Sequence, residues 1–481
     1  MSSLALLELG VELLALLPLF HLAGLVLAYR AIVHTRTAQG AIAWVVSLLL
    51  MPYLAVPLYA VFGRRKFRGY MAARRAGDSL LSGIARELQE HEEAHRSRFE
   101  PERPELAAAE QLAKLPFVAG NAAELLVDGE AIFASILEAV RGAREYILAQ
   151  FYIVRDDGIG RELQALLVER AREGVRVYFL YDEIGCYSLP EVYLDTLREA
   201  GVHVHAFIST RGPNNRFQIN FRNHRKVVVV DGEAAWVGGA NVGDEYMGRD
   251  PRYGAWRDTQ VRLEGPIVQC VQLAFVEDWF FAAGGVPDLD WSPRPAPDGD
   301  LDVLALPSGP ADELETAWLF YVQAIHSARK RLWIASPYFV PDETVVGALQ
   351  LAALRGVDVR ILLPERPDHT LVWLSSFAYL EELCGMGVKI HRYQPGFLHQ
   401  KVMLVDDATS VVGTVNLDNR SFRLNFEITI AVLGSSFARR MEAMFEADFA
   451  RSEEVGVRSL EERPWWFELA AKASRLMAPV Q

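Results

Sequence analysis

The pattern of apolar and polar residues divides the chain into a strongly apolar beginning and a longer region of alternating strands and helices. Apolar residues dominate 13–29 and 41–62, and the second of these runs contains no charged residue. From Leu115 onward, short apolar runs are separated by segments in which apolar residues recur with a helical period. Strands that alternate with helices predict βαβ units and a mainly parallel central sheet. The expected fold class of this region is therefore α/β.

The strand and helix pattern of the α/β region occurs twice. The first copy covers 145–182 and continues through a short helix and a strand at 194–207. The second copy covers 331–364 and continues in the same way at 379–393. Two homologous halves related by a pseudo-twofold axis would bring corresponding segments together at their interface. Because both copies belong to one chain, a complete site between them needs no dimer.

Each copy leads to the motif His-x-Lys-x-x-x-x-Asp, which is followed by Gly-x-x-Asn. The first motif contains His224, Lys226 and Asp231, and the second contains His399, Lys401 and Asp406. Residues i and i+2 of a strand point to the same face, so each copy places an imidazole beside an ammonium group at the start of an apolar strand. A single motif could be a buried strand with a snorkelling lysine and an aspartate in a turn. Two copies with matching tails favour a catalytic function.

Two facing pairs of this kind suit the chemistry of a phosphodiester. The lysines can bind the non-bridging oxygens, helped by the side-chain amides of Asn241 and Asn416 at the ends of the tails. Those asparagines could instead cap turns. Since the unperturbed imidazole pKa is about 6.5, a neutral histidine can attack phosphorus while a protonated partner donates to the leaving alkoxide. Asp231 and Asp406 end their strands and are expected to brace loops.

The duplicated motif is specific for the phospholipase D superfamily, which the chain resembles over nearly its whole length. Segments that flank the motifs narrow the resemblance to the bacterial cardiolipin synthases. These segments are 220–226, 238–246, 336–341 and 416–421, and the segment 36–44 in the apolar beginning of the chain resembles the same family. One departure is Gly413-Thr414, where the first copy has Gly238-Gly239, and we expect it to leave the chemistry unchanged.

The resemblance implies a phosphatidyltransferase that joins two phosphatidylglycerol molecules into cardiolipin and releases glycerol. His224 would be the nucleophile that forms a phosphatidyl-histidine, and His399 would act first as an acid and then as a base; the reverse assignment stays open. Two acids that open corresponding strands would orient the rings across the interface, Glu427 at His224 and Asp258 at His399. Either acid could instead be a surface residue. No metal or other cofactor is expected, because the lysines supply the charge that a cation would bring.

The apolar beginning of the chain predicts a transmembrane helical hairpin. Residues 13–29 approach the lower length limit for a spanning helix, although a cleaved signal peptide is an alternative. Residues 41–62 would form the second span, kinked by Pro52 and Pro57. The resulting division is 1–70 for the two transmembrane helices, 71–114 for a charged helical linker, 115–290 and 300–450 for the two phospholipase D-like halves, and 451–481 for a C-terminal amphipathic or interfacial segment.

Charge places the catalytic region on one side of the membrane. Arg64, Arg65, Lys66 and further basic residues follow the second apolar run, and the positive-inside rule keeps this end cytoplasmic. Arg30 and Arg36 in the connecting loop weaken that bias. We therefore expect a multi-pass protein of the inner cell membrane with a cytoplasmic catalytic region.

Composition narrows the expected partners. A net charge of −13 argues against general nucleic-acid binding, whereas 51% hydrophobic residues favour a membrane and phospholipid substrates such as phosphatidylglycerol. The aromatic run 464–467, with Lys472 and Arg475, predicts a helix that lies on the membrane surface or packs on the domain. Three scattered cysteines predict no disulfide framework. A homo-oligomer is left open.

Other functions share parts of this pattern. A hydrolytic phospholipase D would use the same residues with water as the acceptor. A nuclease of the superfamily would share the motif, but the apolar runs and the acidic net charge disfavour it. A non-enzymatic membrane scaffold would not need two intact histidines. Phosphatidylethanolamine as the donor lipid would need the same chemistry as phosphatidylglycerol.

Overall fold

A computed structural model gives the structure of the protein and describes residues 3–63, 66–76, 83–84, 93–99, 103–208, 210, 220–456 and 463–481. Its contacts divide the chain into a smaller unit, residues 1–69 with 209–221, and a larger unit, residues 70–208 with 222–481. Arg64, Arg65 and much of the linker predicted over 71–114 lie outside the described residues.

The smaller unit contains three helices, α1 (Ser3–His34), α2 (Ala38–Leu50) and α3 (Pro52–Phe62). The first predicted span lies within α1, whose stretch Leu17–His34 is long and apolar enough to cross a membrane. The second apolar run is not one kinked helix, because α2 ends at Leu50 and α3 begins at Pro52. Proline has no N–H to continue the hydrogen bonds of α2, but it suits the first turn of a new helix.

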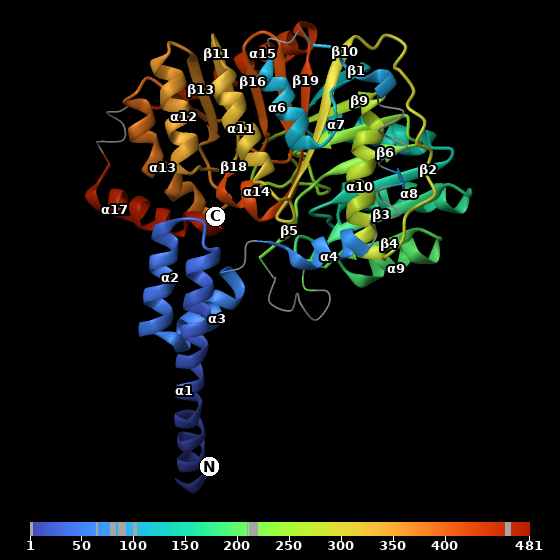
Figure 1. Ribbon diagram of the computed structural model, residues 1–481. Coiled ribbons are helices and arrows are strands. Elements are labelled where there is room, and N and C mark those ends of the chain that lie inside the picture. The colour runs from blue at the N-terminus through green and yellow to red at the C-terminus, as the bar shows by residue number, and fades with distance from the viewer. Residues whose placement is uncertain are drawn as a thin grey trace. The chain divides into compact units, whose positions relative to one another are not determined.

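The larger unit is built on a 16-stranded sheet (Figure 1). At its centre, β1 (Val118–Val127) pairs antiparallel with β10 (Leu301–Ser308). Beyond β1 the order is β9 (Thr259–Glu264), β7 (Ala234–Gly238), β6 (Val227–Val230), β2 (Tyr146–Phe151), β3 (Arg176–Asp182) and β4 (His203–Phe207). Beyond β10 it is β19 (Asn425–Leu433), β17 (Thr409–Gly413), β16 (Val402–Val405), β11 (Arg331–Ala335), β13 (Asp358–Pro364), β14 (Lys389–Tyr393) and β20 (Ser452–Glu454).

The sheet is mixed, which corrects the expectation of a mainly parallel one. Parallel pairs join β2, β3 and β4 on one side and β11, β13 and β14 on the other. A helix connects the strands within each of these groups, as parallel pairing requires. The pairs nearer the centre, such as β6 with β7 and β16 with β17, are antiparallel. They follow one another through short turns, and a short turn between neighbouring strands gives an antiparallel hairpin.

Helices and short strands complete the larger unit. Its helices include α7 (Asp128–Gly142), α8 (Gly158–Arg172), α9 (Glu191–Glu199), α10 (Ile267–Ala283), α11 (Thr316–Ser327), α12 (Glu343–Leu354), α13 (Thr370–Cys384) and α15 (Ser435–Phe449). The others are most of α4 (Arg68–Ala76), α6 (Pro104–Ala113), α14 (Asn419–Arg423), α17 (Trp465–Ser474) and the 3₁₀ helix η1 (Arg475–Val480). The short strands are β5 (Arg222–Asn223), β8 (Trp256–Arg257), β12 (Phe339–Val340), β15 (Phe397–Leu398) and β18 (Leu417–Asp418).

The C-terminal helix α17 packs on the domain, which was one of the two alternatives for this segment. The buried ring of Phe467 lies against Phe377 of α13, with ring centroids 5.1 Å apart. On the opposite side of α17, the side chains of Trp465, Trp466 and Leu469 are largely exposed. The helix therefore has an apolar outer side in addition to the side that it buries.

Candidate active site

The first histidine is held by the strand that carries Glu427. β5, which precedes His224, pairs in parallel with the start of β19. The backbone N–H of His224 donates to the Phe426 carbonyl oxygen over 2.9 Å. Nδ1 of the His224 ring lies 3.0 and 2.9 Å from the two carboxylate oxygens of Glu427. The ring and its acid therefore come from opposite sides of the central β1–β10 pair.

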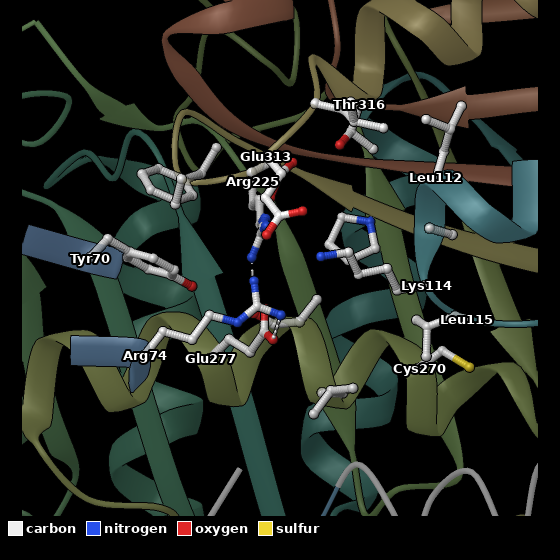
Figure 2. A pocket seen from close by; sticks show the side chains of 18 of the residues that line it. Tyr70, Arg74, Leu112, Lys114, Leu115, Arg225, Cys270, Glu277, Glu313 and Thr316 are labelled. Carbon is white, nitrogen blue, oxygen red and sulfur yellow. Dashed lines mark hydrogen bonds and ion pairs between the residues drawn. The ribbon is translucent and has the colours of Figure 1, made fainter. Parts of the chain in front are cut away.

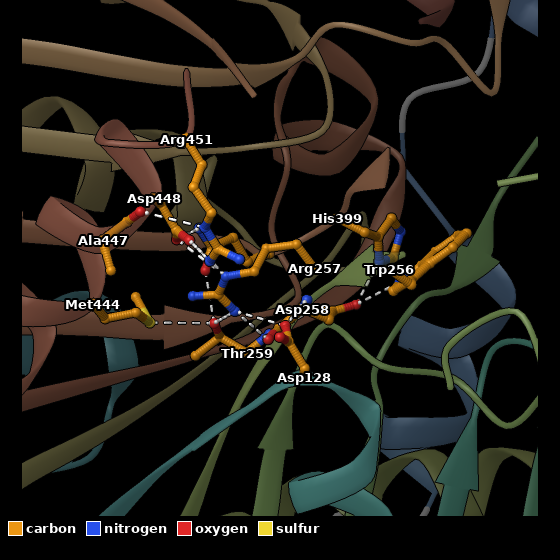
Figure 3. Close-up of polar contacts among 11 residues, drawn as sticks. Asp128, Trp256, Arg257, Asp258, Thr259, His399, Met444, Ala447, Asp448 and Arg451 are labelled. Atoms are coloured by element: carbon orange, nitrogen blue, oxygen red, sulfur yellow. Dashed lines mark hydrogen bonds and ion pairs between the residues drawn. The ribbon is translucent and has the colours of Figure 1, made fainter. Parts of the chain in front are cut away.

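The second histidine is held in the same way by the strand that carries Asp258. β15, which precedes His399, pairs in parallel with β8, and the His399 N–H donates to the Arg257 carbonyl oxygen over 2.8 Å. Nδ1 of His399 lies 2.8 Å from Oδ2 of Asp258 (Figure 3). These are the two pairings that the resemblance implied. A ring that donates Nδ1–H to a carboxylate keeps its Nε2 lone pair for reaction.

Both lysines lie beside their histidines and are buried. Nζ of Lys226 donates to the His224 carbonyl oxygen over 2.6 Å, and Nζ of Lys401 donates to the His399 carbonyl oxygen over 2.5 Å. Nζ of Lys401 also lies 2.9 Å from Nε2 of His399. Each lysine lowers the pKa of the histidine of the other motif as well as that of its own. The two motifs therefore act on one another electrostatically.

Burial dominates the protonation of the four groups. It lowers the pKa of His224 to about 4, with Lys226 and Lys401 adding to the decrease and Glu427 opposing it. Burial, followed by Lys401, lowers the pKa of His399 to about 4 against the effect of Asp258. Burial also lowers the pKa of Lys401 to about 8 and that of Lys226 well below its ordinary value. Buried cations are poorly solvated, so an anion between these groups would stabilise them.

The lowered histidine pKa values predict a loss of stability in acid. Unfolded imidazoles titrate near 6.5, so the unfolded chain binds more protons than the folded chain between about pH 6.5 and 4, and stability falls as the pH decreases through this window. Each ring should contribute a loss on the order of 2 kcal/mol between pH 7 and pH 5. We expect the melting temperature of the His224→Gln/His399→Gln variant to fall less over this range than that of the wild type. His369→Gln, which changes an exposed histidine, is the control. Equal slopes for the wild type and the double variant would contradict the prediction.

The motif aspartates brace loops. The Asp231 carboxylate accepts the backbone N–H groups of Arg144, Glu145 and Tyr146 over 2.9, 2.8 and 2.9 Å. Asp406 accepts the corresponding N–H groups before β11, those of Arg329, Lys330 and Arg331. Each aspartate therefore fixes the chain just before the first strand of its βαβ unit, and its carboxylate is used within the protein.

The two asparagines after the motifs have different surroundings. The Asn241 side chain accepts the Ile153 N–H over 3.0 Å and donates to the Tyr246 hydroxyl over 2.7 Å. Oδ1 of Asn416 is buried and has no hydrogen-bond partner among the described residues. A buried polar atom without a partner requires an explanation, and a bound substrate would provide one. Both ends of the Asn241 amide are hydrogen-bonded within the protein, so Asn241 braces its loop. The Asn416 amide oxygen remains able to accept a hydrogen bond.

The Gly413-Thr414 departure gives the two acids different neighbours, and its expected neutrality for the chemistry stays a prediction. A Cβ atom on Gly239 would lie 2.0 Å from Oδ1 of Asp258, so the carboxylate occupies the space that a side chain would need. At the corresponding position of the second copy, the Thr414 hydroxyl accepts the backbone N–H of Ile428 over 2.9 Å. Burial raises the pKa of Glu427, His224 lowers it most, and Thr414 adds a smaller decrease. Asp258, the shorter acid, thus lies beside Gly239, and Glu427, the longer acid, lies beside Thr414.

Two buried aspartates that sequence reasoning missed anchor the residues next to the histidines. Nη1 of Arg225 lies 2.9 Å from the Asp278 carboxylate on α10. Nε2 of Gln400 donates over 2.9 Å to Asp448 on α15, which also binds Arg257 (Figure 3). Both acids occur in similar apolar surroundings, Glu-Asp-Trp-Phe and Glu-Ala-Asp-Phe. An aspartate that follows a glutamate and precedes an aromatic residue at corresponding places of the two copies was the signal that could have identified them.

Asp448→Ala should destabilise the larger unit strongly. The change leaves the buried guanidinium of Arg257 without its main carboxylate, and breaking a buried ion pair from one side costs about 3–5 kcal/mol. We expect a clear decrease in melting temperature in detergent. Glu446→Ala removes an exposed carboxylate from the same helix and serves as the control. A melting temperature for Asp448→Ala equal to that of the control would show that the ion pair is not needed for stability.

Aromatic rings cover the histidines. The ring centroid of Tyr152 lies 5.0 Å from that of His224, and the ring centroid of Trp256 lies 5.2 Å from that of His399. Nζ of Lys226 lies 5.3 Å from the Tyr152 ring, within cation–π range. These contacts limit the access of water to both rings.

A pocket elsewhere in the larger unit contains neither histidine. Its lining includes Tyr70, Arg74, Arg225 and Glu277 (Figure 2). Arg74 pairs with Glu277 over 2.8 Å, and the Tyr70 hydroxyl donates to Asp278 over 2.9 Å. Arg74, Glu277 and Asp278 are thus paired within the protein, and these contacts lie in the framework around Arg225.

The regions that carry the motifs match a known family. Residues 136–254 and 321–449, just over half of the chain, match the family described as "Cardiolipin synthase, PLD-like domain". The chain belongs to this family. Its relatives in the cardiolipin synthase family extend over nearly the full length. Cardiolipin synthase A of Pseudomonas fluorescens strain Pf-5 is 49% identical over 468 residues, which are 97% of this chain and 98% of that protein. Cardiolipin synthase A of Pseudomonas aeruginosa strain LESB58 is 50% identical over 467 residues, 95% and 94% of the two chains.

A solved structure shares the fold of the cardiolipin synthase family seen here. The crystal structure of phosphatidylserine synthase from Haemophilus influenzae Rd KW20 has a TM-score of 0.58 and 17% identity, and it covers 79% of this chain and 100% of that one. This likeness supports a mixed α/β phospholipase D-like fold for the larger unit.

Proposed function

We propose that this chain is a cardiolipin synthase, which transfers a phosphatidyl group from one phosphatidylglycerol to another and releases glycerol. Full-length relatives at 47–50% identity carry the name cardiolipin synthase A. The observation that supports the chemistry best is the pair of buried histidines, each bonded to a buried acid and flanked by a buried lysine. Two lysine cations beside two histidine bases suit the phosphate of a lipid.

The architecture that goes with this function is a pair of homologous halves, 115–290 and 300–450, related by a pseudo-twofold axis. Support comes from the strand order, which repeats outward on both sides of β1 and β10. The exchange of acids between the motifs gives further support, because each half supplies a histidine and the acid for the other histidine.

In the first step, Nε2 of His224 attacks phosphorus. The bond from phosphorus to Nε2 forms, and the bond to the glycerol oxygen breaks. Glu427 accepts the Nδ1–H and stabilises the positive charge that develops on the ring. The negative phosphate raises the pKa of the His399 ring, so that its Nε2 takes up a proton from solvent when the substrate binds, and Lys401, with Nζ 2.9 Å from Nε2, keeps its own charge. Protonated His399 then gives its Nε2 proton to the departing glycerol oxygen.

In the second step, the acceptor phosphatidylglycerol takes the place of glycerol. Neutral His399 removes the proton from the acceptor hydroxyl, whose oxygen attacks phosphorus. The bond from phosphorus to Nε2 of His224 breaks, and cardiolipin leaves. Lys226, Lys401 and the side-chain N–H groups of Asn416 would hold the non-bridging oxygens in both steps, and the Asn416 Oδ1 would be free to accept a hydrogen bond from a substrate hydroxyl. Asn241 would brace the loop through Tyr246.

The experiment that tests the proposed function is lipid analysis after expression in a host that lacks cardiolipin. Cardiolipin with released glycerol is the expected result. Phosphatidic acid in place of cardiolipin would support a hydrolytic phospholipase D, and release of ethanolamine would identify phosphatidylethanolamine as the donor. A host that expresses the His224→Ala/His399→Ala variant is the control, since this variant keeps the anchor and loses both rings.

We also propose that the larger unit works at the cytoplasmic face of the inner membrane. Lys66, Arg68, Arg74 and Arg75 follow the apolar helices, and positive charge at this position favours the cytoplasm. The net charge of −13 disfavours nucleic acids as partners, and the 51% of hydrophobic residues favours a membrane and its phospholipids.

A further inference from the structure

The second apolar run folds back on itself (Figure 1). The ring centroids of Trp44 on α2 and Tyr59 on α3 lie 5.0 Å apart. In one continuous helix, the 15 residues between these positions would separate them by about 22 Å. Leu48 and Ala55, which lie closer to the helix break on each side, share a buried cluster with Tyr59. The chain therefore reverses direction at Met51 and Pro52, and α3 returns toward the start of α2.

The reversal lies partway along α1. The ring of Tyr53 lies 6.0 Å from Phe20 and 5.5 Å from His21, and Gly24 lies against Leu48 and Pro52. Positions 20–24 of α1 are about 15–21 Å from its end at His34, whereas the hydrocarbon core of a bilayer is about 30 Å thick. With 13 and 11 residues, α2 and α3 are each too short to cross this core.

The surface of the turn between α2 and α3, residues 49–54, is apolar enough to lie in the hydrocarbon layer. Its exposed residues are all apolar or aromatic, namely Leu49, Leu50, Met51, Tyr53 and Leu54. Turns that emerge into water are rich in glycine and polar residues, so this composition places the turn inside the hydrocarbon layer. Irregular backbone at that depth must be covered by protein.

Helix α1 covers the irregular backbone between α2 and α3, and Gly24 allows it to pack closely enough to do so. The Leu48 carbonyl loses its usual helical partner because residue 52 is proline, and a Cβ atom on Gly24 would lie 2.4 Å from the Leu48 oxygen. Only glycine lets α1 pack this closely over the break. The Met51 carbonyl is satisfied by the N–H groups of Leu54 and Ala55.

The distribution of positive charge agrees with a helical pair that returns. The chain has no lysine or arginine before Arg30. If α2 and α3 crossed the membrane together, Arg30 and Arg36 would face the side opposite to the basic residues 64–75. If α2 and α3 instead turn back to the side from which they entered, Arg30, Arg36 and the basic residues 64–75 all lie on that side of the membrane. Only the acidic start of the chain then faces the opposite side. The second arrangement satisfies the positive-inside rule without exception in this region.

We propose that α1 crosses the membrane once and that α2 and α3 form a re-entrant hairpin that enters from the cytoplasmic side and returns to it. The N-terminus then faces the outer side, and the chain from Gly63 onward is cytoplasmic. This topology replaces the two crossings expected from hydropathy, and it does not depend on the reaction that the larger unit performs.

Labelling of single cysteines with a membrane-impermeant maleimide in spheroplasts tests the proposal on the full chain. Ser3→Cys marks the start of α1, Ala38→Cys marks the exposed start of α2, and Val192→Cys marks an exposed site of the larger unit. The unsubstituted chain, whose three cysteines all lie in the larger unit, gives the blank. Elution in detergent as a single species shows that each variant is folded, independently of activity.

We expect Ser3→Cys to be labelled in intact spheroplasts and Ala38→Cys and Val192→Cys only after permeabilisation. Two crossings predict the reverse for Ser3→Cys and Ala38→Cys, with Val192→Cys still protected. Labelling of Ala38→Cys from outside, or protection of Ser3→Cys together with Val192→Cys, would overturn the re-entrant hairpin. Cardiolipin analysis of the same cultures tests the proposed function separately.

Discussion

His224→Ala should lower phosphatidyl transfer by about 10⁴-fold or more, because removing a nucleophile leaves only substrate binding and electrostatic stabilisation. No covalent phosphatidyl-enzyme should form on this variant with any substrate. His399→Ala should be equally slow with phosphatidylglycerol, whose glycerol oxygen needs a proton to leave. The two variants should differ when the donor carries a p-nitrophenol leaving group, which departs without protonation.

With the p-nitrophenyl donor, His399→Ala should release one equivalent of nitrophenol and then stop, with the phosphatidyl group attached to His224. The protein lacks the base that activates the acceptor, so the adduct should accumulate. Release of nitrophenol followed by mass spectrometry of the intact protein measures both events. His369→Ala, at an exposed histidine, should behave like the wild type. A stable adduct on His224→Ala and none on His399→Ala would reverse the assigned roles.

Glu427→Gln should reduce the rate of adduct formation by about 10³-fold while changing substrate binding little. The negative charge of Glu427 raises the pKa of His224 against burial, and its carboxylate accepts the Nδ1–H that fixes the reactive tautomer. The amide keeps the size of the side chain but supplies no charge, so the cationic ring of the intermediate loses its stabilisation.

Comparison with Asp258→Asn separates the two acids. Asp258 supports His399, so with the p-nitrophenyl donor Asp258→Asn should still form the adduct quickly and should be slow only in the transfer to the acceptor. Glu381→Gln, at an exposed carboxylate of the same unit, is the control for loss of charge. Single-turnover kinetics give the two rates. Equal effects of Glu427→Gln and Asp258→Asn on adduct formation would show that the two histidines do not have separate roles.

Much of the candidate site could be predicted from the sequence because its residues sit at fixed positions in a repeated pattern. Strand alternation places His224 beside Lys226, and the resemblance supplied the pairing with Glu427, which the structure contains. The bracing of loops by Asp231 followed from its place at the end of a strand. Asp278 and Asp448 were missed because each lies near a glutamate in its helix, and no local spacing shows which carboxylate is buried or what it binds.

The features that sequence reasoning missed depend on tertiary contacts. Pro52 predicts an interruption, but whether the chain bends or reverses depends on the fit of Gly24 over the break. The sheet was expected to be mainly parallel because its helices were easier to recognise than the short turns between β6 and β7. Asn241 and Asn416 have the same place in their motifs, and their bonding differs because Asn241 contacts the Ile153 N–H and the Tyr246 hydroxyl.

The exchange of carboxylates between the motifs bears on the ancestry of the chain. A polypeptide with one motif and one acid-bearing strand leaves its own ring without a counterion, whereas two such polypeptides complete two centres at once. Joining them end to end therefore keeps a working catalyst at every stage. Once the two copies are joined, the acid of each copy and the residue beside it can be substituted independently. The result here is Asp258 with Gly239 in one copy and Glu427 with Thr414 in the other. Fusion thus allows the roles of the His224 and His399 rings in the reaction to diverge through substitutions in one copy at a time.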